Sequence, residues 1–233
     1  MRKIFLPFLV TLLFPTILFA KLPSKLIDTP INSFYSQDEF AVDFTVYRDG
    51  GVVTWLEMGI KPGFNLGFSV DFYKMIGEDS MKTRPPRLSA RVRVYRGDFF
   101  LPAFTIGYLG QGYGRYHDGN YENEEKGFYV ALEREVWIPN LIWNAGLNIA
   151  DFKKADLYGF FNVRYLLFNK LLLSMEYDNI RRTPNSRLNL GFRYFITDNL
   201  SMGLGLRKLN KLDQGIERIL QIVYVGDFNI LGD

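Results

Sequence analysis

The feature that most constrains the fold of this chain is a strict alternation of apolar and polar side chains. The segment FAVDFTVY (40–47) places apolar residues at every even position, with Asp43 on the other parity. LSARVRVY (88–95) sets Arg91 and Arg93 against a second apolar series. Alternation of this length is typical of a β-strand with two unlike faces. No segment shows a helical period of comparable length, so the sequence predicts an all-β fold.

The spacing of these segments predicts how the strands connect. Short turns such as 61–65 and 168–169 alternate with long polar loops such as 75–86 and 111–126. This rhythm favours an antiparallel transmembrane β-barrel of about 12 strands, within roughly 10 to 14, with both termini periplasmic. The expected strands are 40–47, 52–60, 66–75, 87–95, 101–110, 127–136, 141–150, 157–167, 170–179, 187–195, 199–208 and 217–228.

A secreted β-sandwich is the alternative, because its strands also alternate. A sandwich buries its apolar face and has no need of alternating loop lengths. The polar parity here is rich in charge, which suits a barrel lumen, and the apolar parity would face lipid, where every backbone group must be paired. The predicted lumen charges are Asp43, Glu57, Asp71, Arg91, Arg93, Glu133, Glu135, Arg164, Glu176, Asp178, Arg193 and Arg207.

The N-terminus predicts export. A short basic start precedes the apolar run IFLPFLVTLLFPTILFA, which is shorter than the roughly 20 residues that a spanning helix needs. Residues 1–20 are therefore interpreted as a signal peptide cleaved near Ala20 rather than as an anchor. The predicted division continues with a periplasmic N-terminal segment (21–38), the barrel (39–228) and a C-terminal tail (229–233).

The C-terminal stretch RILQIVYVGDF (218–228) alternates and ends on an aromatic residue. We expect it to close the barrel against the strand that begins at Phe40. Its ending is similar to the signal read by the outer-membrane assembly machinery, with Tyr224 and Phe228 as the candidate residues. The assembly machinery is thus an expected partner.

Composition narrows the remaining classes. The chain has no cysteine, which excludes disulfides, thiolate metal sites and a lipidated N-terminal cysteine. Positive and negative charges nearly balance after Ala20, so nucleic acid is not an expected partner. The absence of a second long apolar run argues against a helical membrane protein. The predicted location is the bacterial outer membrane.

Five lysine or arginine residues lie directly before or after a run of outward-facing strand residues, at the loop end of the strand. We expect them to face lipid at the outer rim, where cations cost little. Simple snorkelling of long side chains explains such positions equally well. A sharper interpretation is a site for lipid phosphates, with lipopolysaccharide as a partner. The five residues are Arg48, Lys74, Lys126, Lys208 and Arg218.

No pattern predicts catalysis. An outer-membrane lipid hydrolase would need a histidine beside a nucleophilic serine, but His117 is the sole histidine and lies in a glycine-rich loop without serine. Asp118, Asn120 and Glu122 alternate faintly like a calcium loop, yet the central glycine and closing glutamate are missing. We therefore expect no enzyme activity, no metal and no cofactor.

Several segments together resemble the YjbH-type barrel proteins, which are linked to exopolysaccharide production. The similar stretches include PAFTIGYLGQGYGRY (102–116), GFYVALEREVWIPNLIWNAGLNIAD (127–151) and LLLSMEYDN (171–179), and the resemblance covers about half of the chain. The familiar members are longer and lipidated, unlike this chain. The resemblance implies a non-enzymatic envelope role connected with polysaccharide production or export, and polysaccharide as a partner.

Two functional alternatives differ in whether the barrel lumen is filled or open. A filled barrel favours a scaffold or envelope-assembly factor, whereas an open one favours a narrow porin for small solutes. Bulky aromatic residues share the inward parity with the charges and would narrow any passage. They are Tyr73, Tyr95, Tyr129, Tyr158 and Phe160.

Overall fold

The computed structural model describes residues 21–117, 120–123, 125–150, 152, 156–181, 186–211 and 215–228. The predicted signal peptide (1–20), Asp118 and the predicted tail (229–233) lie outside these residues. No helix in the described part of the chain is long and apolar enough to cross a membrane.

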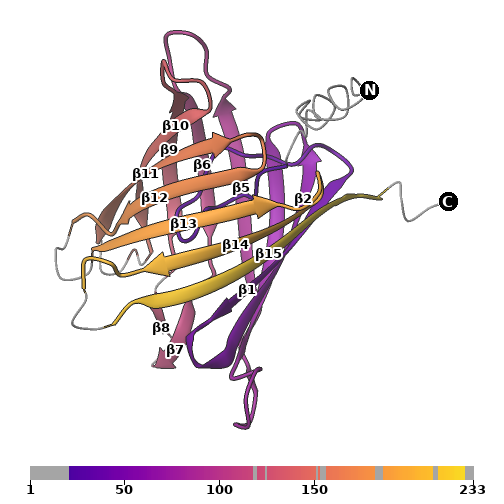
Figure 1. Ribbon diagram of the computed structural model, residues 1–233, viewed down its shortest axis with the longest axis vertical. Helices are drawn as coiled ribbons and strands as arrows, with labels where there is room; N and C mark the ends of the chain where they lie inside the picture. Colours follow the sequence, from indigo (N-terminus) through magenta and orange to yellow (C-terminus); the bar gives the residue numbers. More distant parts are fainter. Residues whose placement is uncertain are drawn as a thin grey trace, which may run out of the picture.

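Twelve antiparallel strands among the described residues close into one barrel (Figure 1). They are β1 (Glu39–Tyr47), β2 (Gly51–Lys61), β3 (Phe64–Tyr73), β5 (Arg87–Tyr95), β6 (Ala103–Leu109), β9 (Gly127–Glu135), β10 (Leu141–Ile149), β11 (Leu157–Leu167), β12 (Leu171–Asp178), β13 (Arg187–Phe195), β14 (Leu200–Arg207) and β15 (Glu217–Asp227). Neighbours in sequence pair with each other, and β15 pairs with β1 to complete the circle. The predicted all-β antiparallel barrel of about 12 strands is confirmed.

The closing pair has the predicted partners. Phe40 on β1 lies opposite Gly226 on β15, and Val42 lies opposite Tyr224. The rings of Phe40 and Phe228 are 4.9 Å apart between centroids, so the aromatic residue at the end of the chain packs on the first strand. Their outward packing agrees with the sequence-based prediction for this seam.

Three short strands within the long connections were not predicted. β4 (Lys82–Thr83) extends the sheet beside β3, and β7 (Tyr113–His117) pairs with β8 (Asn120–Asn123) as a separate hairpin. The connection from β1 to β2 is a 3-10 turn, η1 (Arg48–Gly50). The sequence had assigned 111–126 to a polar loop, but its aromatic residues give the hairpin a face to bury.

The two ends of the barrel differ. We call the end with the short connections the turn end, where β1 begins and β15 finishes, and the opposite end the loop end. The connections at the turn end are 62–63, 96–102, 136–140, 168–170 and 196–199. The β7–β8 hairpin belongs to the loop end, at the bottom of Figure 1.

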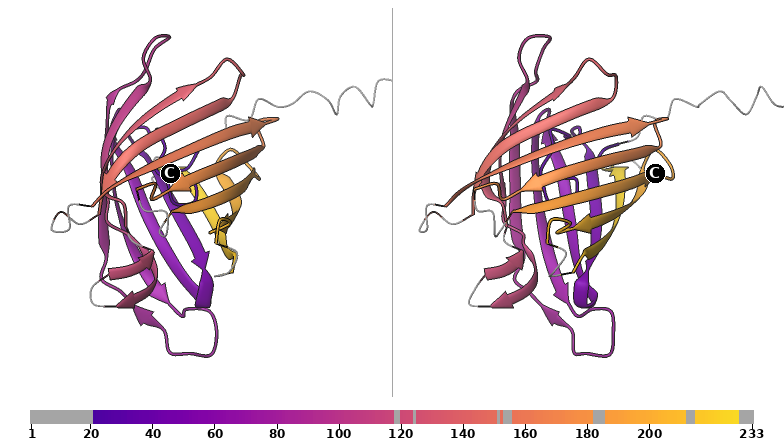
Figure 2. Two further views of the ribbon diagram at one scale, coloured as in Figure 1. Left: turned by 90° about the vertical axis from the view of Figure 1, so that its left-hand side faces the viewer. Right: turned by 60° about the vertical axis from the view of Figure 1, so that its left-hand side comes forward.

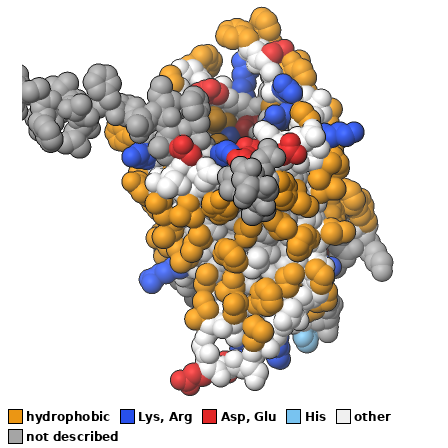
Figure 3. Space-filling model, turned by 90° about the vertical axis from the view of Figure 1, so that its right-hand side faces the viewer, with side chains coloured by type: hydrophobic (Ala, Val, Ile, Leu, Met, Phe, Trp, Pro, Cys, Tyr) orange, Lys and Arg blue, Asp and Glu red, His pale blue; other side chains and the backbone are white. Residues whose placement is uncertain are grey.

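Alternating side chains point into the barrel and out of it. Phe192 and Tyr194 on β13 are 45% and 51% exposed, whereas their neighbour Arg193 is 4% exposed. The outward residues form a broad apolar surface between the more polar ends of the molecule (Figure 3). An apolar exterior around a closed sheet is the arrangement that lipid requires. Figure 2 shows the tilted strands that carry it.

The largest difference from the sequence-based prediction lies in residues 22–35, which we call the plug. They were predicted as part of a periplasmic segment (21–38), but they fold back inside the barrel (the indigo trace in Figure 1). Ile27 is 4% exposed and Thr29 is fully buried. The plug reverses direction within itself: the Leu26 N–H donates to the Thr29 carbonyl at 3.0 Å.

The plug also supplies part of the core inside the barrel. Leu26 and Ile31 pack with Leu172 and Phe195 on the wall near the turn end. The loop-end half is packed instead by inward aromatic residues of the wall, including Tyr129 and the fully buried Phe160. Apolar packing thus fixes both arms of the plug, while its tip meets a polar wall.

Candidate functional site in the barrel lumen

The tip of the plug binds a buried carboxylate on β12. Glu176 is fully buried and accepts hydrogen bonds from the backbone N–H of Ile27 at 2.8 Å and of Asp28 at 3.0 Å. It also accepts from the Thr29 hydroxyl at 2.9 Å and from the Asn189 amide at 3.2 Å. The reverse turn directs these donors to one side, so a single carboxylate satisfies them all. Such charge-assisted bonds are among the stronger ones in proteins.

The carboxylate at the tip, Asp28, is bound in turn by the wall and the hairpin. Its Oδ2 accepts from Arg207 Nε at 2.9 Å and from the Asn189 amide at 3.2 Å. Its Oδ1 accepts from the hydroxyl of Tyr113 on β7. Three donors from β14, β13 and the hairpin therefore converge on one carboxylate that belongs to neither wall nor hairpin.

Arg207 is the centre of this arrangement and is fully buried. Its Nη1 donates to Glu217 at 2.5 Å and its Nη2 to the side-chain Oδ1 of Asn123 at 3.0 Å. The guanidinium also lies over the ring of Tyr113, 4.7 Å from the centroid. All three nitrogens are engaged, as a buried guanidinium requires.

Two carboxylates of the wall form ion pairs with four cations around the tip of the plug. Asp178 accepts from Lys126 and, at 2.8 Å, from Arg187. Glu217 pairs with Arg207 and with Lys208, each at 2.5 Å. The negative charge of Asp28 therefore adds to a wall that is locally rich in positive charge.

Two of the predicted rim cations are in fact part of this cluster. Lys126 is 5% exposed and pairs with Asp178, and the Lys208 ammonium pairs with Glu217. The prediction that they face lipid is wrong, because it extended the strand alternation through positive backbone angles. Gly127 has φ of 64° and Lys208 has φ of 60°, and each turns the side chain away from the outward series.

The other three rim cations lie at the loop end as predicted. The side chain of Arg48 is 61% exposed, and Arg218 is exposed on the outward parity of β15. Lys74 pairs with Asp79 at 2.7 Å, and this hydrogen bond raises the pKa of Lys74 and lowers the pKa of Asp79. Arg48 and Arg218 line a shared open depression of about 420 Å³ outside the barrel.

Two inward arginines of β5 hold the arms of the plug. Arg91 pairs with Glu57 at 2.6 Å and donates to the carbonyl of Ile31 at 3.2 Å. Arg93 donates to the Asn32 side chain at 2.9 Å. These two arginines also lie over the ring of Phe34, at 4.6 and 4.4 Å.

A second ion pair anchors the same arm. Arg164 donates to Glu133 through both terminal nitrogens, at 2.8 and 2.7 Å. Glu133 also accepts from the backbone N–H of Asn32 at 2.9 Å. Glu135, by contrast, was predicted as a lumen charge but is exposed at the turn end. Its carboxylate accepts from the backbone N–H of Asn140 in the adjoining turn.

Three further predicted lumen charges are buried but lie off the plug tip. Asp71 accepts from the Tyr47 hydroxyl at 2.6 Å and pairs with Arg84 at 3.3 Å. Asp43 accepts from the Thr45 hydroxyl. Arg193 donates to the Gln221 side chain at 2.8 Å.

Inward glycines give the plug its room, and this was the sequence signal that could have revealed it. A Cβ added at Gly205 would lie 3.2 Å from the side chain of Ile27, and one at Gly191 would lie 3.3 Å from it. At Gly59 an added Cβ would meet the Ser36 carbonyl oxygen at 1.9 Å. Glycine weakens a strand interior and often marks a close approach of another backbone. The wall is therefore hollowed where the plug lies.

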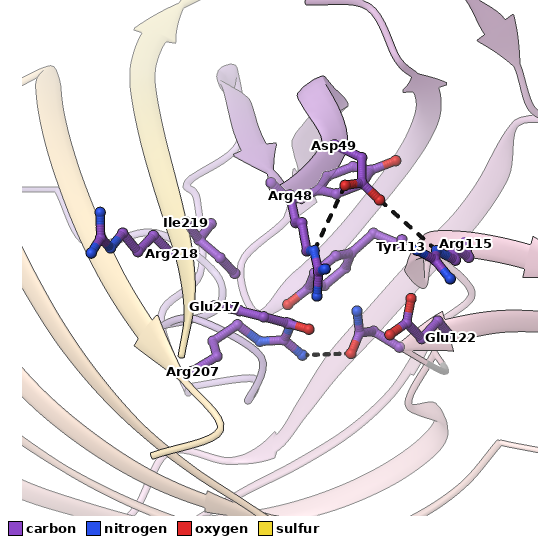
Figure 4. Close-up of a pocket in the computed structure, with 12 residues that line it drawn as sticks. Arg48, Asp49, Tyr113, Arg115, Glu122, Arg207, Glu217, Arg218 and Ile219 are labelled. Atoms are coloured by element: carbon purple, nitrogen blue, oxygen red, sulfur yellow. Dashed lines mark hydrogen bonds and ion pairs between the residues drawn. The ribbon is translucent and has the colours of Figure 1, made fainter. Parts of the chain in front are cut away.

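The cavities that the described residues enclose around the plug are small. A cavity of about 30 Å³ lies between the plug and the hairpin, beside Lys25 and Trp55. Another, of about 10 Å³, lies at the loop end directly over Arg207 (Figure 4). Each has room for about one or two water molecules. In the described part of the chain, the plug occupies the lumen toward the turn end and the β7–β8 hairpin contacts its tip from the loop end.

The cavity over Arg207 opens toward arginines of the loop end. Arg48 on η1, Arg115 on β7 and Arg218 on β15 belong to its lining, together with the carboxylates of Asp49 and Glu122 (Figure 4). The side chain of Arg115 is 72% exposed, and Asp49 lies 4.0 Å from it. Both arginines and carboxylates thus line the path from the loop end to Arg207.

Among the described residues, no group of three or more His, Asp or Glu side chains could hold a metal ion. His117 lies on β7 in the hairpin at the loop end. Within that hairpin, the calcium-like pattern falls on β8 and on residues outside those described.

Comparison with known proteins supports the fold. No protein-family model and no curated protein matches the chain. Among solved structures, the KdgM porin is similar at 11% identity and a TM-score of 0.53, over 82% of this chain and 99% of that one. The outer membrane phospholipase of Salmonella typhi gives 14% identity and 0.47, over 85% and 93%. Omp33 of Acinetobacter baumannii gives 11% and 0.45, over 83% and 98%. At these identities the similarity shows the barrel fold alone.

Proposed function

We propose that this chain is a non-enzymatic outer-membrane protein that acts as a narrow, gated channel for small solutes. The closed barrel, its apolar exterior and its likeness in fold to a porin support the membrane location. In the proposed orientation the turn end and both termini are periplasmic and the loop end faces outward, in accord with the usual loop lengths. Residues 22–35 form the gate.

The observation that carries this proposal is that the plug, which is not part of the barrel wall, fills the lumen. Small barrels are filled by side chains of their own wall, whereas wider ones enclose an aqueous interior. Here the wall recedes at Gly205, and Ile27 of the plug occupies the space. A barrel that needed only to be solid would place a larger residue at that position.

The bonding of the plug also suits a gate. Its backbone turns on itself, with the Ile31 N–H donating to the Ser24 carbonyl at 3.0 Å. Its tip is held by side chains, chiefly Glu176 and Arg207, rather than by pairing with a barrel strand. Withdrawal toward the turn end would thus leave every strand pair of the barrel intact.

A disulfide lock tests the gate. The chain has no cysteine, so Ile27→Cys with Gly205→Cys introduces the sole pair, at positions in van der Waals contact. Planar bilayers should show low conductance for the oxidised protein and a larger conductance after reduction, most clearly when Asp28→Asn is added. The Gly205→Cys single variant controls for the loss of the glycine.

Equal conductance in oxidised and reduced protein, with Asp28→Asn present, would refute gating by the plug. That result would favour the alternative of a solid envelope scaffold. The link to exopolysaccharide that the YjbH resemblance implies stays a prediction, to be tested by polysaccharide output after deletion of the protein. A lipid-hydrolase activity is not proposed.

A further inference from the structure

Asp28 occupies a site that is complete without the rest of the plug. Arg207, Asn189 and Tyr113 provide three donors around one carboxylate, and none of the three belongs to the plug. Arg207 is fully buried and Asn189 is fully buried, so neither donor could find bulk water in place of Asp28 without a change in the lumen. The wall is built to hold a carboxylate at this point.

The local charges strengthen this interpretation. Without Asp28, the ion-paired wall cations Arg187, Arg207, Lys126 and Lys208 would share two wall carboxylates, Asp178 and Glu217. Two other carboxylates lie near. Glu122 is 3.7 Å from Lys208 and half exposed, and Glu176 is engaged by the backbone of the plug. The four cations would then outnumber the two wall carboxylates, and the resulting positive charge would favour an anion in the vacated position.

The site has an approach from the loop end. The cavity over Arg207 is bordered by Arg48 and Arg115 together with the carboxylates of Asp49, Glu122 and Glu217, whereas the Arg218 side chain points away from it (Figure 4). A solute that enters here reaches the guanidinium that Asp28 binds, and it takes the position of Asp28 as the tip of the plug withdraws toward the turn end.

We propose that Arg207, Tyr113 and Asn189 form a binding site for the carboxylate of a small acidic solute, and that Asp28 is an internal competitor for it. An acidic solute that binds here displaces the tip of the plug. This rests on the proposed function in that the solute is the cargo of the gated channel. The binding site itself is testable without any measurement of conductance.

Calorimetry on the folded full-length protein provides the first test, with succinate as the probe and succinamide as a neutral molecule of similar size. Removal of the competitor by Asp28→Asn should tighten succinate binding at least tenfold. Asp28→Asn combined with Arg207→Gln removes both members of the ion pair and should abolish binding. Inorganic phosphate serves as a further arm, to separate a carboxylate site from a general anion site.

A labelling experiment keeps the proposal testable if Asp28→Asn fails to fold. An Ile27→Cys reporter in the otherwise unaltered chain should react with an impermeant maleimide at least threefold faster in succinate than in succinamide, at constant ionic strength. Tyr113→Phe should weaken this response, whereas Tyr108→Phe, on the outward face of β6, should not change it.

Three results would overturn the site: equal effects of succinate and succinamide, equal succinate affinity with and without Asp28→Asn, or binding that survives in the double variant. Tighter binding of phosphate than of succinate would overturn the assignment to carboxylates. If the disulfide lock does not change conductance but succinate still competes with Asp28, the gated channel is refuted and the carboxylate-binding site stands. If the lock changes conductance but succinate does not compete, the binding site is refuted and the gated channel stands.

Discussion

Glu176 should decide how firmly the plug is docked, and Glu176→Gln isolates its contribution. Its two oxygens accept from five donors, three of which are backbone N–H groups of the plug tip. In glutamine one oxygen becomes an amide nitrogen that cannot accept, so at least one backbone bond to Ile27 or Asp28 is lost. The side chain keeps its length, which limits the effect to charge and hydrogen bonding.

The size of the effect follows from these bonds. A hydrogen bond to a charged group contributes about 1.5 to 3 kcal/mol, and the bonds that remain weaken when the charge is removed. We expect docking of the plug to lose about 2 to 4 kcal/mol in total. At about 1.4 kcal/mol for each factor of ten, the undocked population should rise roughly 30- to 700-fold.

The assay is thiol labelling of an Ile27→Cys reporter, since position 27 is 4% exposed when the plug is docked. An impermeant maleimide reacts with the undocked state, so the rate follows its population. Glu135→Gln is the matched control, because that exposed carboxylate binds a turn amide away from the plug. Labelling of Glu176→Gln at the control rate, with the barrel folded, would refute the reasoning.

Further predictions concern an ion pair of the barrel wall, the closing strand β15 and the exposed arginines at the loop end. Glu133→Gln leaves a buried arginine unpaired and should lower stability by about 3 to 5 kcal/mol, measured as the unfolding midpoint in detergent. Deletion of 224–233 removes part of the closing strand and should abolish insertion, whereas deletion of 229–233 should be mild; equal insertion would contradict this. Arg48→Gln with Arg218→Gln should reduce lipopolysaccharide co-purification, and unchanged retention would leave snorkelling as the explanation.

The barrel wall could be predicted from the sequence because its rules are local. Alternation with a period of two assigns each side chain to one face, and the turn residues mark where strands end. β11 and β13 begin and end where the pattern predicts, and the β1–β15 seam was placed correctly. The alternation failed at Gly127 and Lys208, where positive φ rotates the chain and carries lysines into the lumen.

The contents of the lumen were decided by tertiary structure alone. Nothing local in residues 22–35 predicts that Asp28 meets Arg207, because the two are 179 positions apart and belong to no common periodic element. Their contact depends on the diameter of the closed barrel and on the room left at Gly205. The sequence determined a wall with charges on its inner face. Only closure of the sheet determined that those charges would bind a segment of the same chain, since buried charges must find partners within the space that the barrel encloses.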